Sequence, residues 1–279
     1  MTPDAALPPY GASMQRRARA SNVAALLASV VVWLALLGPL GALLVHISPT
    51  ATREALGAPG ALTPLVTSVE ASLVALAVLV VAGTPLAWMM ARERLPLPRL
   101  VEAGVLVPLL MPPLVIGLLL VFFLGPATPL GGALSHLHLS ASNTFFALVV
   151  AEVYEAAPYY VLGAQSAFAS VAVELEENAA LLGDPWRRTL RRVTLPLAAP
   201  GLATALATGW ARAIGAFGAV IVIAYHPYGL PMQIWVTLQQ SGLAAALPFA
   251  LLLVLVSLPL PLLAFSWSAR SRVGTRVAT

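Results

Sequence analysis

The sequence predicts an all-α polytopic membrane protein with six transmembrane helices and both termini in the cytoplasm. Of its 279 residues, 59% are hydrophobic and only 9% are charged, against about 25% charged in an ordinary soluble domain. Such a chain lacks the polar side chains to cover a water-facing surface. Six apolar segments are long enough to cross a bilayer core, which takes about 20 helical residues. The basic residues gather in alternate loops between these segments.

The expected spans are long apolar runs separated by polar or glycine- and proline-rich stretches. They are residues 23–47, 64–91, 101–124, 143–168, 198–225 and 245–268. Backbone inside hydrocarbon must satisfy its own hydrogen bonds, so we expect each span to be helical. The first follows three arginines, as a signal peptide would. Its apolar run exceeds the roughly 7–15 residues of such a region, so we expect a retained helix.

Arginine placement sets the orientation. The chain has no lysine or cysteine, and thirteen of its fifteen basic residues lie before the first span, between the second and third, between the fourth and fifth, or after the sixth. By the positive-inside rule these regions are cytoplasmic. The expected organisation is a cytoplasmic tail at residues 1–22, a transmembrane domain at 23–268 and a second tail at 269–279. Residues 1–15 read as disordered. The arginine placement explains the basic balance better than nucleic-acid binding does.

Several of the expected spans contain prolines. Each removes a helix hydrogen-bond donor, and interrupted helices are tolerated in membranes where they are buried or line a cavity. A single proline is most simply a kink. The adjacent pair Pro112 and Pro113 predicts a true interruption of the third span. The outer loops at residues 125–142 and 226–231 are rich in glycine and proline, and we expect compact turns there.

A polar segment between the fourth and fifth spans has a helix–turn–helix pattern. Glutamates open it and four arginines close it, an order that suits the helix dipole. Gly183 suits a helix C-terminus. Asp184 and Pro185 suit the cap and the first position of a second short helix. On charge alone, a loop whose arginines merely anchor the topology would be the simpler explanation.

The spacing within this segment favours a docking element instead. Glu177-Asn178-Ala179 is followed by Gly183 and, ten residues later, by Val193-Thr194-Leu195-Pro196. This resembles the E-A-A-x-x-x-G-x(9)-I-x-L-P signature of permease subunits of ABC importers, with Asn178 where that family usually has alanine. The resemblance implies that the loop at 170–197 docks onto a separate ATPase, which binds ATP and Mg²⁺. This chain would then be no enzyme and bind no cofactor. The implied ATPase-coupling residues are Glu177, Asn178, Ala179, Gly183, Asp184, Leu195 and Pro196.

A second motif narrows the substrate class. The run Arg212–Val220 reads R-A-I-G-A-F-G-A-V and resembles the R-A-I-G-E-F-G-A-V run of permeases for molybdate, tungstate and sulfate, with Ala216 at the glutamate position. The resemblance covers about residues 60–268. It implies import of an oxyanion by a homodimer that works with ATPase subunits and an extracytoplasmic binding protein. The location would be the bacterial or archaeal cell membrane. Iron(III), thiamine, phosphonate and polyamine stay open as alternative substrates.

Arg212 lies near the middle of the fifth expected span. A charge at mid-bilayer costs about 2.5–3.5 kcal/mol, so it is usually paired or functional. In one reading, copies of Arg212 in a dimer attract the anion, the nearby glycines allow close helix approach and Phe217 forms a constriction. In the other, Arg212 forms a structural ion pair with Glu152 or Glu155. The expected path and gate residues are Arg212, Gly215, Phe217 and Gly218.

Glu152 and Glu155 also leave open two other classes of protein, an intramembrane enzyme and an ion-gradient carrier. Glu152 and Glu155 share a helix face at i and i+3, which an intramembrane enzyme or an ion-gradient carrier with a proton relay would need. Nothing else in the sequence completes a catalytic site. His136 and His138 form an H-x-H pair in an outer loop without further ligands nearby, so we expect no metal site.

Overall fold

A computed structural model describes residues 10–276, and every regular element in that range is a helix. The chain divides into two units, Met1–Pro49 and Thr50–Thr279. The first unit contains α1 (Tyr10–His46), which begins inside the segment expected to be a tail. No glycine or proline lies between Ala12 and Leu37, so nothing there stops the helix from extending N-terminally. The rest of the expected tail, residues 1–9, lies outside the described residues, as do residues 277–279 at the other end.

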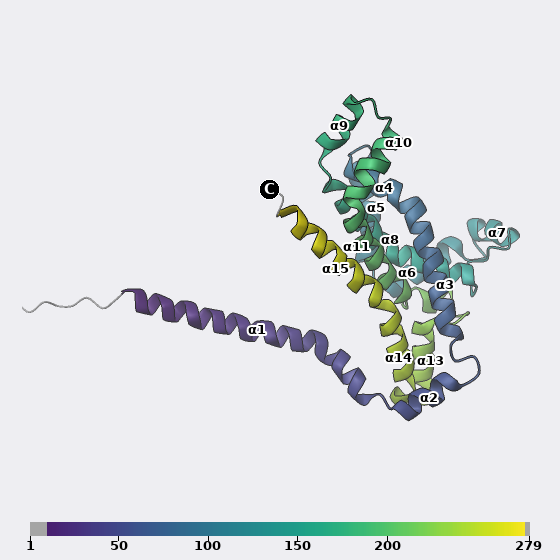
Figure 1. Ribbon diagram of the computed structural model, residues 1–279. Coiled ribbons are helices and arrows are strands. Elements are labelled where there is room, and N and C mark those ends of the chain that lie inside the picture. Colours follow the sequence, from purple (N-terminus) through teal and green to yellow (C-terminus); the bar gives the residue numbers. More distant parts are fainter. Residues whose placement is uncertain (1–9, 277–279) are drawn as a thin grey trace, which may run out of the picture. The chain divides into compact units, whose positions relative to one another are not determined.

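The second unit contains the remaining helices apart from Pro49, the first residue of α2 (Figure 1). In chain order they are α2 (Pro49–Gly57), α3 (Thr63–Val78), η1 (Leu79–Gly83), α4 (Thr84–Ala91), α5 (Pro98–Leu110), α6 (Pro113–Leu124), α7 (Pro129–His136), α8 (Phe145–Ala169), α9 (Val173–Leu181), α10 (Trp186–Thr189), η2 (Leu190–Thr194), α11 (Leu195–Ile214), α12 (Val220–Ile223), α13 (Leu230–Ser241), α14 (Leu243–Ser257) and α15 (Pro259–Arg276).

Among the described residues, four helical stretches are long and apolar enough to cross a membrane. They are Ala25–His46, Thr63–Ala91, Phe145–Ala169 and Leu243–Ser268, which match the first, second, fourth and sixth expected spans. A further pair, α5 and α6, passes the same test together but is bent by 118° at the break between Leu110 and Pro113. The predicted interruption at Pro112 and Pro113 is therefore confirmed. The six-span count and the cytoplasmic termini stay predictions.

The fifth expected span, residues 198–225, is not one continuous helix. Helix α11 ends at Ile214, and only the four-residue α12 follows, from Val220. The break contains Gly215 and Gly218, and glycine is the costliest helix residue after proline. Gly218 lies so close to Pro113 that an added Cβ would stand 2.3 Å from that proline's Cβ. The interruption in the fifth segment thus packs directly against the interruption in the third.

Both π-helical turns lie just before a proline. Segment η1 precedes Pro85 in α4, and η2 precedes Pro196 in α11. A proline ring clashes with the carbonyl of the residue four positions earlier, and a widened turn is one way to relieve that clash. The helices therefore continue through these prolines with a local change in winding rather than ending.

Helix α8 lies at the centre of the second unit, packed against α3, α4, α5 and α11. Buried side chains form two clusters along it, one with α6 and α12 and one with α4 and α11. The α8–α11 contact depends on small residues: an added Cβ on Gly163 would lie 2.9 Å from that of Ala205, and one on Gly201 would lie 2.6 Å from that of Ala167. Small residues let membrane helices approach closely, so these positions fix how α11 lies against α8.

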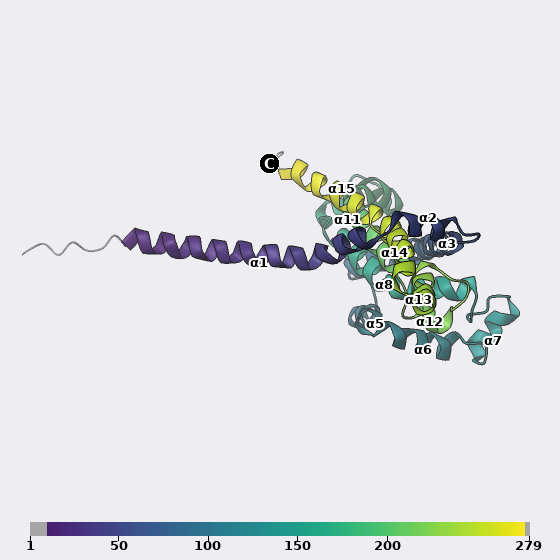
Figure 2. The same ribbon diagram turned by 90° about the horizontal axis from the view of Figure 1, so that it is seen from below.

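The connections that we expect to lie on the outer side contain more helix than predicted. Residues 125–142, expected to be turns, include α7, which Thr128 caps by accepting a hydrogen bond from the Gly131 N–H at 3.0 Å. Helices α2 and α13 were also not predicted, because both are short and only moderately apolar. Figure 2 shows α5, α6 and α7 along one edge of this unit, while α9 and α10 form one end of it in Figure 1.

Candidate functional site

The segment between α8 and α11 forms the predicted helix–turn–helix. Helix α9 runs from Val173 to Leu181, and α10 begins at Trp186. No residue of α9 is buried, so this hairpin has little hydrophobic core of its own. Hereafter the coupling hairpin means residues 171–194. The signature continues into the first turn of α11, where Leu195 is half-buried and Pro196 is exposed.

Gly183 ends α9 in a Schellman motif. Its φ is +86°, in the left-handed region that favours glycine. The Gly183 N–H donates to the Ala180 carbonyl at 2.9 Å, and the Asp184 N–H donates to the Ala179 carbonyl at 3.1 Å. These are the two hydrogen bonds that define the motif. The predicted role of Gly183 at the helix end thus has a geometric cause within this chain.

The predicted capping of α10 by Asp184 is wrong. Pro185 is extended, with ψ of 151°, and is itself the N-cap residue, so the helix starts one position later than expected. Asp184 is then too early in the chain to cap the first turn. Its carboxylate instead accepts a hydrogen bond from Arg188 Nη1 at 2.9 Å.

Large apolar side chains are exposed where the hairpin turns. Leu181 is 85% exposed, Leu182 89% and Trp186 60%. Glu177 and Asn178 are exposed on the same hairpin, and Ala179 is half-buried. Burying a leucine is worth about 1.5–3 kcal/mol, so an ordered helix end that exposes two of them offers that free energy to a partner surface.

A buried ion pair connects the hairpin to α4. Arg92 Nη2 lies 2.6 Å from Glu176 Oε1, and the Arg92 side chain is only 5% exposed. Partial burial alone would raise the pKa of Glu176, but hydrogen bonds from Arg92 and Thr194, with the charges of Arg92 and Arg94, hold the pKa below its ordinary value. Sequence analysis read Arg92 only as a topology signal, because nothing local connects it to a residue more than 80 positions away.

Arg212, in the last turn of α11, forms an ion pair with α8. Its Nη2 atom lies 2.5 Å from Glu155 Oε2, although the angles are not those of a hydrogen bond. The other carboxylate oxygen of Glu155 accepts the Ala219 N–H at 3.1 Å. Glu155 therefore holds the chain on both sides of the break between α11 and α12. Glu152 contacts neither group; it accepts a hydrogen bond from Ser72 Oγ at 2.9 Å.

The other expected gate residues lie at this break but face different neighbours. Gly215 is exposed and Gly218 packs on Pro113. Phe217 is half-buried, with its ring centroid 5.7 Å from that of Trp235 in a tilted arrangement. The structure thus brings Arg212, Gly215 and Gly218 together around one break, while Phe217 packs toward α13.

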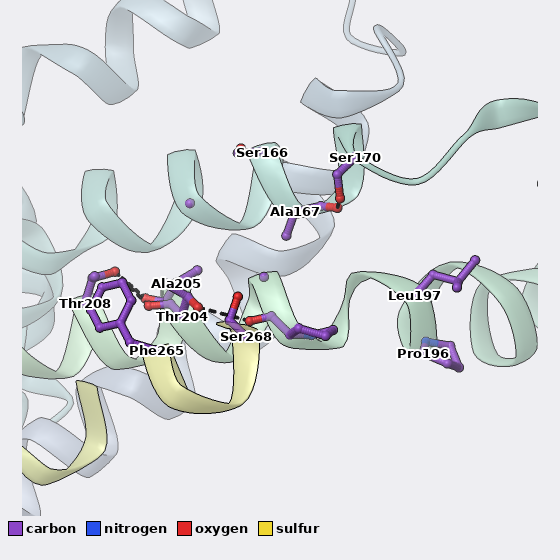
Figure 3. A pocket seen from close by; sticks show the side chains of 13 residues that line it. Ser166, Ala167, Ser170, Pro196, Leu197, Thr204, Ala205, Thr208, Phe265 and Ser268 are labelled. Atoms are coloured by element: carbon purple, nitrogen blue, oxygen red, sulfur yellow. Dashed lines mark hydrogen bonds between the residues drawn. The ribbon is translucent and has the colours of Figure 1, made fainter. Parts of the chain in front are cut away.

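A pocket of about 990 Å³ lies between α8, α11 and α15 (Figure 3). The side chains that carry hydroxyls in it are Ser166, Ser170, Thr204, Thr208 and Ser268. Ser170 Oγ donates to the Ala167 carbonyl at 2.7 Å and Thr208 Oγ1 to the Ala205 carbonyl at 2.9 Å. None of the lining residues is charged, and Pro196 is the only one that sequence analysis had singled out. The hydroxyls come from separate helices without a shared motif, so the sequence offered no signal for them.

Comparison with known proteins identifies the family. The family described as "Binding-protein-dependent transport system inner membrane component" matches residues 83–272. A probable molybdenum ABC transporter permease protein of Haloferax volcanii is 40% identical over 229 residues, which cover 82% of this chain and 83% of that protein. The molybdate/tungstate transport system permease protein WtpB of Thermococcus kodakarensis is 30% identical over 194 residues, which cover 70% of this chain and 72% of that protein.

A solved structure supports the fold independently. A chain in the crystal structure of a bacterial ABC transporter involved in the import of alginate, an acidic polysaccharide, matches with a TM-score of 0.63 at 19% identity, covering 92% of this chain and 98% of that chain. The family resemblance drawn from the two sequence motifs is confirmed. This chain belongs to the binding-protein-dependent transport system inner membrane components and is a multi-pass membrane permease subunit of an ABC transporter.

Proposed function

We propose that this permease imports molybdate or tungstate, with sulfate as the next candidate. The support is the run from Arg212 to Val220, together with the molybdenum and molybdate/tungstate transport functions for which the relatives from Haloferax volcanii and Thermococcus kodakarensis are named. In this proposal two copies of the chain form the membrane path, and an extracytoplasmic binding protein delivers the anion. ATP and Mg²⁺ bind to two separate ATPase subunits, so this chain catalyses no reaction.

The proposed coupling of this chain to the ATPase rests on the exposed apolar end of the coupling hairpin. An ordered turn that leaves Leu181, Leu182 and Trp186 in water fits the recognition mode in which a short helix lays its apolar side chains into a partner's groove. Glu177 and Asn178 stand exposed beside them. We assign this hairpin and the adjoining Leu195 and Pro196 to docking on the ATPase. ATP-driven closure of the ATPases would move the two hairpins together and open the path outward.

We assign to Arg212 mainly a structural role, which is to hold the break between α11 and α12 in shape. Its partner Glu155 is fully buried and neutralises the guanidinium, while 30% of the Arg212 side chain stays exposed. An ion pair that holds both sides of the break would keep Gly215 to Gly218 in one arrangement. The pocket beside α11 is lined by hydroxyls and carries no charged side chain, so it offers an oxyanion no opposite charge that would hold it tightly.

Reconstituted transport tests the proposed function. The chain would be placed in proteoliposomes with its ATPase and binding protein, with ATP on the ATPase side and radiolabelled molybdate on the other. We expect ATP-dependent uptake that excess tungstate suppresses more strongly than sulfate does. Stronger suppression by sulfate would make sulfate the substrate. Absence of oxyanion uptake, in a complex whose ATPase still responds to the binding protein, would refute the oxyanion assignment.

The energy source separates the proposal from an ion-gradient carrier. Uptake should stop when ATP is omitted and persist when an uncoupler collapses the proton gradient. The opposite pattern would point to Glu152 and Glu155 as proton-carrying groups and would refute the ATP-driven reading.

A further inference from the structure

One buried guanidinium joins three helices at the base of the coupling hairpin. Arg92 follows directly after α4, and two nitrogens of its guanidinium donate to Glu176 in α9: Nη2 lies 2.6 Å from Oε1, and Nε lies 3.1 Å from Oε2. Nη1 donates to the Phe168 carbonyl at 3.0 Å and Nη2 to the Val171 carbonyl at 3.3 Å. Phe168 lies in the last turn of α8, and Val171 lies two residues beyond its end. Arg92 therefore binds α9 and the end of α8 at once.

Glu176 extends this junction to the start of α11. Its Oε1 atom also accepts a hydrogen bond from Thr194 Oγ1 at 2.7 Å, and Thr194 is buried at the end of η2. The Glu176 carboxylate thus binds both Arg92, just after α4, and Thr194, just before α11. A charge-assisted pair with both carboxylate oxygens engaged fixes orientation more strongly than a single contact does.

A second contact lies between the α4 end and the other arm of the hairpin. Trp88 of α4 stacks on Trp186 of α10, with ring centroids 6.4 Å apart and planes 28° apart. The Arg94 guanidinium lies 4.7 Å above the Trp88 ring, within the range of a cation–π interaction. Both arms of the hairpin therefore contact the last turn of α4 or the residues just after it.

We infer that Arg92 is a positioning residue that makes the coupling hairpin a rigid extension of α4, so that movement of the hairpin passes directly into the span Thr63–Ala91. Because no residue of α9 is buried, apolar packing does not fix this helix. The polar junction and the tryptophan stack do so instead. Without Arg92, the Trp88–Trp186 stack and the two chain ends are the contacts described above that still join the hairpin to the membrane helices. The inference rests on the proposed docking of the hairpin to an ATPase.

The first test measures how firmly Arg92 holds the coupling hairpin when no partner protein is present. Amide hydrogen exchange would be followed in the purified chain for Arg92→Gln, Glu176→Gln and Arg99→Gln. Arg99 is an exposed arginine in the first turn of α5, so Arg99→Gln matches the loss of one positive charge in Arg92→Gln. Removing one partner of a buried pair is strongly destabilising, so we expect exchange at residues 173–189 to accelerate at least about tenfold in the first two variants only. Equal exchange in all three would overturn the inference.

The second test measures transmission in the assembled complex. Uptake per ATP hydrolysed would be compared in proteoliposomes that hold equal amounts of ATPase-bound chain. We expect Arg92→Gln to lower this ratio about fivefold or more, the lower end of typical coupling energies. Arg92→Lys should be intermediate, because an ammonium keeps the charge but not the fork geometry. Arg99→Gln should match the wild type. A purely structural role would reduce assembly and leave the ratio unchanged, which would overturn the inference.

The two tests keep this inference separate from the proposed function. If the wild-type complex shows no ATP-driven uptake of any oxyanion, the proposed substrate fails. In that case the ratio is replaced by stimulation of the ATPase by its binding protein, which Arg92→Gln should reduce and Arg99→Gln should not.

Discussion

Gly183 offers the sharpest test of the coupling hairpin, because its folded-state environment is open. Nothing lies within 4 Å of the position that a Cβ would take, yet its φ is +86°. A substitution therefore meets no clash within this chain and costs only backbone strain. For an L-residue that strain is roughly 1–2 kcal/mol, a factor of about 5–30 in the equilibrium for the native turn. Gly183→Ala should lower the population of the docked hairpin by that factor at most.

The assay compares variants of Gly183 that differ in backbone strain and in side-chain size. Gly183→Asn adds a side chain of a type that tolerates the left-handed region, whereas Gly183→Arg adds both strain and a long side chain at the proposed ATPase contact. We expect each variant to fold with wild-type yield. Gly183→Arg should abolish ATP-dependent uptake, and Gly183→Ala should reduce it. If uptake by Gly183→Asn exceeds that by Gly183→Ala, conformation dominates; the reverse order would assign the glycine to close approach of the partner.

Wild-type uptake by Gly183→Arg would refute the reasoning, because a large charged side chain would then sit at the hairpin turn without disturbing docking. Loss of folded protein in that variant would also contradict the reasoning, since no atom of this chain lies within 4 Å of the added Cβ. Size-exclusion chromatography of the detergent-purified chain measures the yield, and co-purification with the ATPase measures docking.

Three further predictions concern named contacts. Arg212→Gln should lower the yield of folded protein, because it leaves the buried Glu155 carboxylate unpaired at a cost of about 3–5 kcal/mol; adding Glu155→Gln should restore the yield, and normal assembly of the single variant would contradict this. The lowered pKa of Glu176 means that its stabilisation is present above the ordinary glutamate value of 4.5 and is lost as pH falls through the lower folded value. The protection factors of the hairpin amides, which correct for the intrinsic pH dependence of hydrogen exchange, should fall across that acidic range, and Glu176→Gln should remove this fall. Leu181→Ser with Leu182→Ser should leave the melting temperature nearly unchanged, because both side chains are exposed, while ATPase co-purification is lost; retained binding would exclude this apolar end as the contact.

The sequence predicted the features whose signals add up along one segment. Spans such as Phe145–Ala169 follow from apolarity summed over about 20 residues, and the interruption at Pro112 and Pro113 follows from two adjacent missing donors. The helix–turn–helix followed from charge order and from Gly183. Short elements such as α13 contain too few residues for a clear hydrophobic signal, and their helical structure depends on tertiary packing.

The contacts that shape the site were beyond the sequence for a related reason. Arg92 and Glu176 stand 84 positions apart, and Glu155 meets Ala219 across 64. A lone arginine beside a span has the same appearance whether it sets topology or joins helices. Asp184 was misassigned because capping depends on the backbone angle of Pro185, which an Asp-Pro sequence does not determine. Spacing alone also left open which glutamate would meet Arg212.

Helix α11 connects the two places where carboxylates hold the chain. Glu176 binds Thr194 just before α11 begins, and Glu155 binds Arg212 and the Ala219 N–H around its end. The helix has 20 residues, about 30 Å at 1.5 Å per residue, which is close to the thickness of a bilayer core. Its packing on α8 through Gly163 and Gly201 leaves no room for added volume at that contact, so α11 cannot move closer to α8. In the proposed cycle, a displacement of the hairpin therefore reaches the break at Gly215 through a single stiff helix, and the Glu155 contacts are the ones that must yield for the path to change.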